Sequence, residues 1–224
     1  MKTTAIVVAA GKGVRFGSKE KKPFVKLRHK PLLSYALTAL QQSPKIDDIV
    51  LVVDGSSIEK AGALTARYGI TKVRRIVAGG KIRSQSVRNG LGHIDSGTSL
   101  VLIHDGVRPF VSKDLVERLI AAAKKFGAAI SAVPVKPTIK LSKDGLFVSY
   151  TPERHYLWEA QTPQVFRKEL IEKAYKKIGT KGLTDDAALI ELAGAKVRLV
   201  QGDYKNIKIT TREDLKIAEA LVKK

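Results

Sequence analysis

Short hydrophobic runs alternate with amphipathic stretches along most of the chain. The runs TAIVVAA, DIVLVVD, VRRIVAGG, SLVLIHD and AAISAVPV are rich in valine and isoleucine, as strands buried on both faces of a parallel sheet are. Between them, PLLSYALTALQQS has leucines at helical spacing, and SKDLVERLIAAAKKFG predicts a helix that Ser112 caps and Gly127 ends. This alternation predicts an α/β fold with a mostly parallel sheet in three layers.

One segment breaks this pattern. KPTIKLSKDGLFVSYTPERHY alternates apolar and polar residues around Asp144-Gly145, which predicts a β-hairpin. We expect it to leave the sheet as a protruding arm over about residues 134–157. After the arm, TDDAALIELAG predicts a helix capped by Thr184, VRLVQGD and NIKITT predict strands, and a last helix begins near Arg212. The sequence has no internal repeat or linker, so we expect a single domain over residues 1–224.

Charge and composition narrow the possible partners. The chain has 41 Lys and Arg against 21 Asp and Glu, a net charge of +20 that favours anionic ligands. It has no cysteine, which excludes disulfides and thiolate metal sites. The apolar stretch from Ala5 to Ala10 is too short for a signal peptide, and no run reaches the ~18 apolar residues of a membrane span. These features predict a cytoplasmic protein that does not associate with membranes.

The first strand ends in a glycine-rich turn followed by many cations. Gly11 and Gly13 let a ligand approach the backbone, and Arg15 and Lys22 supply charge suited to a polyphosphate. The segment fits neither the dinucleotide fingerprint, since Phe16 stands where a third glycine belongs, nor a Walker A loop. A plain turn with solvated lysines is the alternative interpretation.

Later segments add further candidates at strand ends. Gly79-Gly80 forms a second glycine turn, after which Arg83 and Ser86 can face the same cleft. Asp105 follows a buried strand, where a carboxylate beside a polyphosphate can bind Mg²⁺, although a helix or turn cap would explain it equally simply. No Ser-His-Asp triad or zinc-type histidine cluster is evident in the sequence, and packing explains His104 better than catalysis does.

The motifs taken together resemble the 2-C-methyl-D-erythritol 4-phosphate cytidylyltransferase family. They are AAGKGVRFG, KPFVKLRHKPLL, GGKIRSQSV, HDGVRPF, VPVKPTIK, LWEAQTPQVF, TDDA and NIKITT, in this order from residue 9 to residue 211. The resemblance implies a Rossmann-like nucleotidyltransferase fold and a Mg²⁺-dependent homodimer. It also implies transfer of a cytidylyl group from CTP to the sugar-alcohol phosphate in non-mevalonate isoprenoid biosynthesis.

The resemblance also implies a role for individual residues. Arg15 and Lys22 would be catalytic and Asp105 would bind the metal. The residues implied for the nucleotide are Ala9, Ala10, Gly11, Gly13, Gly80, Lys81 and Ser86. Those implied for the acceptor phosphate substrate are Thr138, Arg154, Lys208, Arg108 and Thr162. Thr138 and Arg154 lie in the arm, so they would reach the partner subunit's site.

The sequence departs from the family pattern at four of these motifs. Lys81 stands where aspartate is frequent, Pro23 where glutamine is common, and Pro137 where aspartate usually precedes the threonine. Lys205 replaces an acidic residue of some members, which leaves a second protein ligand for Mg²⁺ unassigned.

Two other functions compete with this interpretation. A ribitol 5-phosphate cytidylyltransferase shares several motifs, but LW before QTPQ and the TDDA motif favour methylerythritol phosphate. A nucleic-acid-binding module would also explain the charge of +20. Such modules usually interleave aromatics with the basic residues, and aromatics make up only 6% of this chain. We therefore expect CTP and a polyol phosphate as ligands and no nucleic acid.

Overall fold

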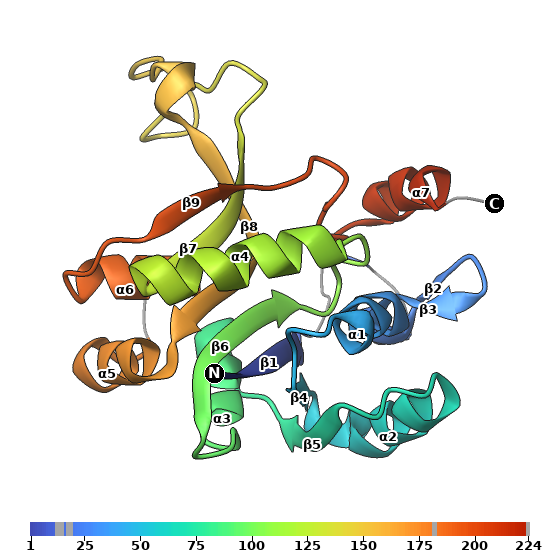
Figure 1. The fold of residues 1–224 in the computed structure, drawn as a ribbon. Helices are drawn as coiled ribbons and strands as arrows, with labels where there is room; N and C mark the ends of the chain where they lie inside the picture. The colour runs from blue at the N-terminus through green and yellow to red at the C-terminus, as the bar shows by residue number, and fades with distance from the viewer. Residues whose placement is uncertain (12–15, 17–19, 181–182, 223–224) are drawn as a thin grey trace.

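A computed structural model of the chain describes residues 1–11, 16, 20–180 and 183–222. Within these residues seven strands form one sheet in the order β5-β4-β1-β6-β8-β7-β9 (Figure 1). They are β1 (Lys2–Ala9), β4 (Asp48–Val53), β5 (Val73–Ala78), β6 (Thr98–Asp105), β7 (Ala128–Pro134), β8 (Trp158–Arg167) and β9 (Arg198–Gln201). Strands β5, β4, β1 and β6 are mutually parallel, whereas β8 is antiparallel to both β6 and β7. The predicted α/β fold with a mostly parallel sheet is confirmed.

Helices cover both faces of the sheet. One face packs against α1 (Leu32–Gln42), α2 (Ile58–Arg67) and α4 (Lys113–Phe126), and the other against α3 (Arg83–Leu91), α5 (Lys168–Ile178) and α6 (Asp186–Leu192). Side chains of β1 alternate between the two layers, with Val7 in the first cluster and Ile6 and Val8 in the second. Because both faces are covered, β1 reads as a continuous hydrophobic run.

Smaller elements complete the fold. They are the short helical turns η2 (Lys22–Phe24), η3 (Gly55–Ser57) and η4 (Arg154–Tyr156), the two-residue strands β2 (Lys26–Leu27) and β3 (Lys30–Pro31), and helix α7 (Arg212–Leu221). No helix in the described part of the chain is long and apolar enough to cross a membrane.

Helix ends follow local chemistry, with one correction. Ser112 caps α4 by accepting a hydrogen bond from the Leu115 amide (3.2 Å), and Gly127 ends that helix with a φ of +87°, both as predicted. Helix α6 is capped by Asp185, whose Oδ1 accepts from the Ala188 amide at 2.9 Å, so the prediction of Thr184 was wrong. A carboxylate one residue later satisfies the free amides and also favours the helix dipole.

One further expectation about strands was wrong. NIKITT forms no strand in the described structure. WEAQTPQVF lies wholly within β8, an interior strand of the sheet. Its polar residues Gln161, Thr162 and Gln164 are buried and hydrogen-bonded, so the segment lacks a hydrophobic strand pattern.

The arm leaves the sheet after β7 and returns at β8, projecting at the top of Figure 1. Its tip turns at Asp144, whose carboxylate accepts from the amides of Leu146 and Phe147, and at Gly145, which has a φ of +76°. The chain reversal is confirmed, but the expected pair of strands is not. Within the described arm, the bridge between Leu141 and Tyr150 is the one β-contact. Prolines at 137 and 152 remove amide donors, and isolated two-stranded ribbons are marginal in water.

Candidate active site

A pocket of about 380 Å³ opens where four parallel strands end. Ala9 closes β1, Asp105 closes β6, and the turns after β4 and β5 complete the rim. The residues lining it include Ala9, Ala10, Gly11, Lys22, Gly80, Lys81, Ser86, Asp105 and Lys208, all named from the sequence. In a parallel sheet the carboxyl ends of neighbouring strands converge on one edge, and ligands bind there.

The two glycine turns touch each other at this rim. A Cβ built on Gly79 would lie 2.3 Å from Ala10 Cβ and 2.8 Å from Ser86 Oγ, so no larger residue fits without movement. Ser86 Oγ accepts from the Gly80 amide (3.1 Å) and donates to Ile82 O (3.2 Å). By contrast, a Cβ on Gly11 would meet nothing within 4 Å. Gly79 is therefore needed for packing, whereas Gly11 faces space that a ligand can enter.

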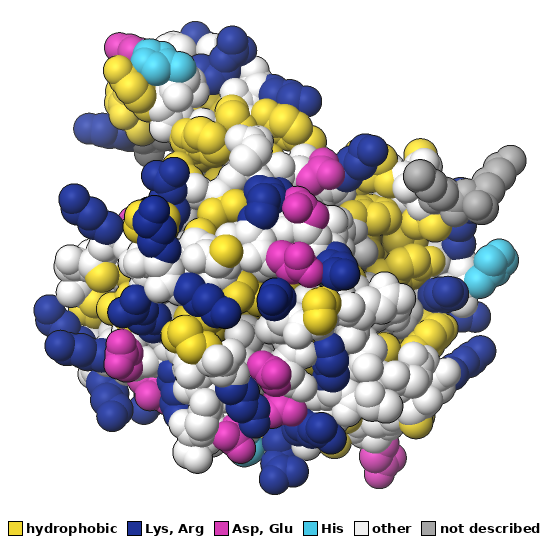
Figure 2. Space-filling view, in the orientation of Figure 1, with side chains coloured by type: hydrophobic (Ala, Val, Ile, Leu, Met, Phe, Trp, Pro, Cys, Tyr) yellow, Lys and Arg dark blue, Asp and Glu magenta, His cyan; other side chains and the backbone are white. Residues whose placement is uncertain are grey.

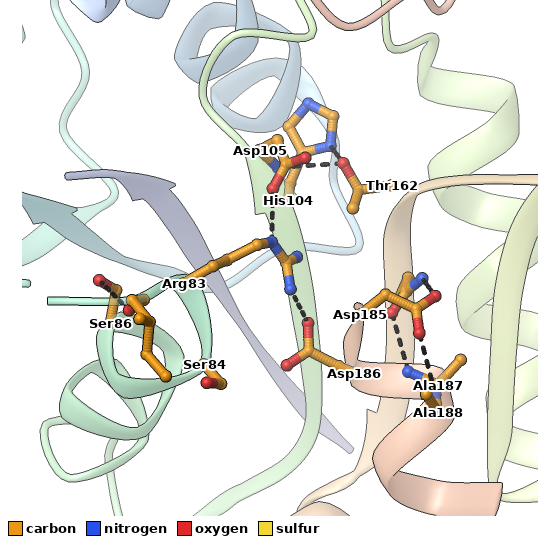
Figure 3. Close-up of polar contacts among 12 residues, drawn as sticks. Arg83, Ser84, Ser86, His104, Asp105, Thr162, Asp185, Asp186, Ala187 and Ala188 are labelled. Carbon is orange, nitrogen blue, oxygen red and sulfur yellow. Dashed lines mark hydrogen bonds and ion pairs between the residues drawn. The ribbon is translucent and has the colours of Figure 1, made fainter. Parts of the chain in front are cut away.

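Asp105 is a buried carboxylate surrounded by cations. Its Oδ1 accepts from Arg83 Nε at 3.0 Å (Figure 3). Its Oδ2 lies 2.7 Å from Lys208 Nζ and 3.9 Å from Arg108 Nε. Burial alone would raise the pKa of this carboxyl group. The nearby Arg83 and Lys208 charges outweigh burial and hold the pKa of Asp105 well below its usual range. Asp105 is thus ionised at neutral pH.

Arg83 links Asp105 to a second buried carboxylate. Its Nη1 donates to Asp186 Oδ2 at 2.7 Å (Figure 3). Asp186 Oδ1 in turn accepts from the Tyr175 hydroxyl at 2.8 Å. Burial, together with the Asp186 charge, raises the pKa of Tyr175, so this tyrosine remains a donor. The sequence placed Arg83 in the cleft and Asp186 in the TDDA motif, but it did not predict that the two pair or that Tyr175 joins them, since a buried ion pair leaves no periodic signature.

His104 is buried and holds the backbone around Asp105. Its Nε2 lies 3.1 Å from Arg108 O, and its Nδ1 lies 3.1 Å from Thr162 Oγ1. A carbonyl only accepts, so we assign the proton to Nε2; the Thr162 hydroxyl then donates to Nδ1 and accepts from the Asp105 amide at 3.0 Å. Burial lowers the pKa of His104 to about 4, which keeps the ring neutral. This agrees with the packing role expected for it.

A second pocket of about 220 Å³ adjoins the first and shares Arg83, Asp105 and Lys208 with it. Arg108 and Thr162, which the resemblance assigned to the acceptor substrate, line this second pocket together with Asp105. Arg108 is 7% exposed, and its Nη1 donates to Asn206 O at 2.7 Å. The first pocket thus brings together the described residues expected at the nucleotide, and the second contains Arg108 and Lys208, two cations expected at the other substrate.

Some expected residues lie elsewhere. Thr138 and Arg154 are exposed on the arm and line neither of these pockets; Arg154 Nη1 donates to Lys136 O at 2.7 Å. Arg15 and Gly13 lie outside the described residues.

Asp54 also lines the first pocket and pairs with Lys21, although the sequence analysis did not name it. It directly follows β4, so the rule that selected Asp105 would have found it.

Magnesium has limited protein ligation here. Among the described residues, no cluster of three or more His, Asp or Glu side chains is arranged to hold a metal. Asp105, which lines both pockets, offers hard oxygen ligands, and each of its oxygens keeps a free lone pair beyond the bonds to Arg83 and Lys208. Asp54 also lines the first pocket, where it is paired with Lys21. One carboxylate suits Mg²⁺ that is carried by substrate phosphates, which is how proteins often bind this ion.

Known proteins resemble this chain over nearly its whole length. The sequence model of the family described as 2-C-methyl-D-erythritol 4-phosphate cytidylyltransferase matches residues 3–224. Proteins of that name from Alkaliphilus metalliredigens and Dehalococcoides mccartyi are 44% and 46% identical; the alignments cover 99% and 100% of this chain and 93% and 97% of theirs.

Solved structures agree with the sequence relatives. The crystal structure of 4-diphosphocytidyl-2C-methyl-D-erythritol synthase from Anaerococcus prevotii superposes with a TM-score of 0.87 at 36% identity, covering 98% of this chain and 95% of that one. The cytidylyltransferase from Francisella tularensis gives 0.82 at 31% identity, with coverage of 99% and 100%. Because the family model, the sequence relatives and the solved structures all match nearly the whole chain, the chain belongs to the 2-C-methyl-D-erythritol 4-phosphate cytidylyltransferase family.

Proposed function

We propose that this enzyme transfers the cytidylyl group of CTP to 2-C-methyl-D-erythritol 4-phosphate. The products are 4-diphosphocytidyl-2-C-methyl-D-erythritol and pyrophosphate, and the reaction serves isoprenoid precursor biosynthesis. One observation carries the proposal: every described residue implied for the nucleotide, together with Lys22, Asp105 and Lys208, lines one pocket at the strand ends. Family membership supplies the identity of the two substrates.

The chemistry requires two anions to meet. A phosphate oxygen of the acceptor attacks the α-phosphorus of CTP, the new P–O bond forms, and the bond to the leaving pyrophosphate breaks. The attacking oxygen is already ionised near neutral pH, so no general base is needed. Two unit charges 4 Å apart repel by roughly 4 kcal/mol at an effective dielectric of 20. Catalysis therefore consists of positioning the substrates and surrounding the reacting phosphates with cations.

The pockets divide this work. Ala9, Ala10, Gly11 and the Gly80 turn would hold the nucleotide, while Lys22, with Arg15, stabilises charge on the transferring phosphorus. Gly13, Lys81 and Ser86 belong to the same nucleotide loops by family resemblance. In the second pocket Arg108, Lys208 and Thr162 would receive the acceptor. Lys208 is shared with the first pocket, which suits a cation placed between the two substrates.

Asp105 would bind Mg²⁺ together with triphosphate oxygens. Bound there, the ion would neutralise part of the charge on the triphosphate. Arg83 and Lys208 hold the carboxylate from two sides, so its lone pairs point in fixed directions before the nucleotide arrives. The depressed pKa of Asp105 keeps the ligand ionised across the working pH range.

We further propose a homodimer in which the arms are exchanged. Leu146, Phe147 and Val148 at the tip are 82%, 76% and 58% exposed, and Figure 2 shows hydrophobic side chains gathered on and beneath the arm. Exposed apolar surface of this kind favours a protein partner. Thr138 and Arg154 lie on the same arm, remote from the lining of both pockets of their own chain. A second subunit's site is the natural place for them.

The test is to incubate the enzyme with CTP, Mg²⁺ and one polyol phosphate at a time while measuring pyrophosphate. We expect rapid release with 2-C-methyl-D-erythritol 4-phosphate and at least about a hundredfold slower release with ribitol 5-phosphate. Faster turnover of ribitol 5-phosphate would assign the enzyme to the alternative substrate. A reaction with CTP and Mg²⁺ but no polyol phosphate controls for simple hydrolysis of CTP.

A further inference from the structure

The turn after β9 carries Lys208 to Asp105, and a buried amide anchors this turn to the sheet. Asn206 is 0% exposed. Its Nδ2 donates to Thr162 O at 2.8 Å and to Gln161 Oε1 at 3.3 Å, and both acceptors belong to β8. The main chain of Asn206 also closes the turn, because its amide donates to Asp203 O at 2.9 Å.

Two of the three cationic side chains that line the second pocket, Arg108 and Lys208, depend on where this turn lies. The Asn206 carbonyl accepts from Arg108 Nη1 at 2.7 Å, so moving the turn moves the buried guanidinium. Lys208 is two residues further along, and its Nζ lies 2.7 Å from Asp105 Oδ2. The side-chain amide of Asn206 therefore fixes the turn after β9, and this turn positions both Arg108 and Lys208.

The anchor on β8 is itself rigid. Thr162, whose carbonyl accepts from Asn206, uses its hydroxyl to bond His104 Nδ1 at 3.1 Å and the Asp105 amide at 3.0 Å. Thr162 therefore bonds to both sides of the pocket: its carbonyl holds Asn206, on the turn that carries Lys208, and its hydroxyl holds the amide of Asp105. The position of Lys208 relative to Asp105 thus depends on Thr162.

The Asn206 side chain is not explained by stability alone. Its Oδ1 is buried and has no hydrogen-bond partner in the described structure, and an unpaired buried oxygen is unfavourable. The two bonds donated by Nδ2 are what the residue contributes. An apolar side chain would fill the space without the unpaired oxygen, but it would leave the turn unattached to β8.

We propose that Asn206 is a positioning residue that sets Arg108 and Lys208 for the phosphate of the acceptor substrate, an inference that rests on the proposed function. Asn206 itself touches neither reacting phosphate. Its effect should fall mainly on the acceptor side, because Arg108 lines the second pocket and not the first, and the nucleotide turns at Gly11 and Gly80 follow other strands, β1 and β5. Lys208 lines both pockets, so we expect a smaller change for the nucleotide.

The test compares Asn206→Ala with the wild-type enzyme in steady-state assays with each substrate varied. We expect the KM for the acceptor to rise about tenfold or more and kcat to fall, while the KM for CTP stays within about twofold. Gln41→Ala is the matched control. Gln41 also joins two segments through its amide, accepting from the Lys72 amide and donating to Thr71, but on a surface away from both pockets. Its KM values should equal those of the wild type.

A merely structural role makes a different prediction. It would lower kcat through a smaller active fraction and leave both KM values unchanged, and that result overturns the proposal. If Asn206→Ala does not fold, Asn206→Ser, which keeps a small polar side chain too short to reach β8, is judged by the same criteria.

A binding measurement separates this inference from the proposed function. If the wild-type protein releases no pyrophosphate with any polyol phosphate, the proposed function fails. The positioning role is then judged by calorimetric titration with inorganic phosphate. Phosphate binding weakened about tenfold in Asn206→Ala supports the positioning role, and wild-type affinity in that variant, or no phosphate binding by the wild type, overturns it.

Discussion

Replacing Gly79 by alanine probes the contact between the two nucleotide turns. The added Cβ would lie 2.3 Å from Ala10 Cβ and 2.8 Å from Ser86 Oγ. The two carbons must separate by about 1 Å to reach ordinary van der Waals contact. Overpacking of this kind costs about 1–3 kcal/mol in unfolding free energy. For a chain of this size that corresponds to a fall in Tm of about 2–4 °C per kcal/mol.

The same displacement should appear in nucleotide binding. A misplacement of about 1 Å near reacting groups can cost about a hundredfold in rate, so we expect kcat/KM for CTP to fall by about that factor. The KM for the acceptor should change little. Calorimetry gives Tm, and pyrophosphate release with CTP varied gives the kinetics. Gly92→Ala is the matched control, because its Cβ would make only an ordinary contact, 3.5 Å from Asn89 O.

Two results would refute this reasoning. A Gly79→Ala enzyme with wild-type Tm and wild-type kcat/KM for CTP would mean that the turns do not pack as the structure has them. A lowered Tm with unchanged kinetics would mean that the contact is structural and that the nucleotide lies elsewhere.

Three further predictions concern charge. Lys22→Met should lower kcat about 10²–10³-fold while leaving circular dichroism and Tm unchanged, and near-normal turnover would remove Lys22 from the catalytic residues. Mixing inactive Arg154→Ala and Lys22→Ala subunits should restore part of the activity if arms are exchanged, whereas no recovery after subunit exchange verified by native mass spectrometry would place Arg154 in its own chain's site. Because burial lowers the pKa of His104 to about 4, the unfolded state alone binds its proton between about pH 6.5 and 4. Stability should therefore fall by about 2 kcal/mol from pH 7 to pH 5 through this residue. The free energy of unfolding, measured with urea and without added metal, should fall by about 2 kcal/mol less between pH 7 and pH 5 in His104→Asn than in the wild type. An equal fall in both proteins would contradict a buried, neutral His104.

Much of the site could be predicted because it depends on strand ends. Ala9 and Asp105 end hydrophobic runs, and Gly80 follows one closely; in a parallel sheet these positions must converge. The same rule extends to Asp54, which was overlooked. Segment type was predictable wherever one face or both faces are hydrophobic, as in β1 and α4.

Other features depend on contacts that no local pattern records. Gln161 and Gln164 of strand β8 are buried, and their side chains form hydrogen bonds to segments distant in the sequence. The sequence of β8 therefore resembles that of a polar loop. The pair of Arg83 with Asp186 joins residues 103 positions apart. The arm has the alternation of a hairpin, but among the described residues no third strand pairs with it. Its β-pairing is therefore limited to the single bridge between Leu141 and Tyr150.

The direction of group transfer can be followed with oxygen isotopes. The acceptor phosphate is labelled with heavy oxygen, the reaction is run to completion with CTP, and the products are resolved by phosphorus NMR. Attack of the acceptor on the α-phosphorus predicts heavy oxygen in the bridge of the new diphosphate, with isotope shifts on both of its phosphorus atoms, and unlabelled pyrophosphate. Heavy oxygen in the pyrophosphate, or no isotope shift at the cytidine-bound phosphorus, would contradict cytidylyl transfer at this site.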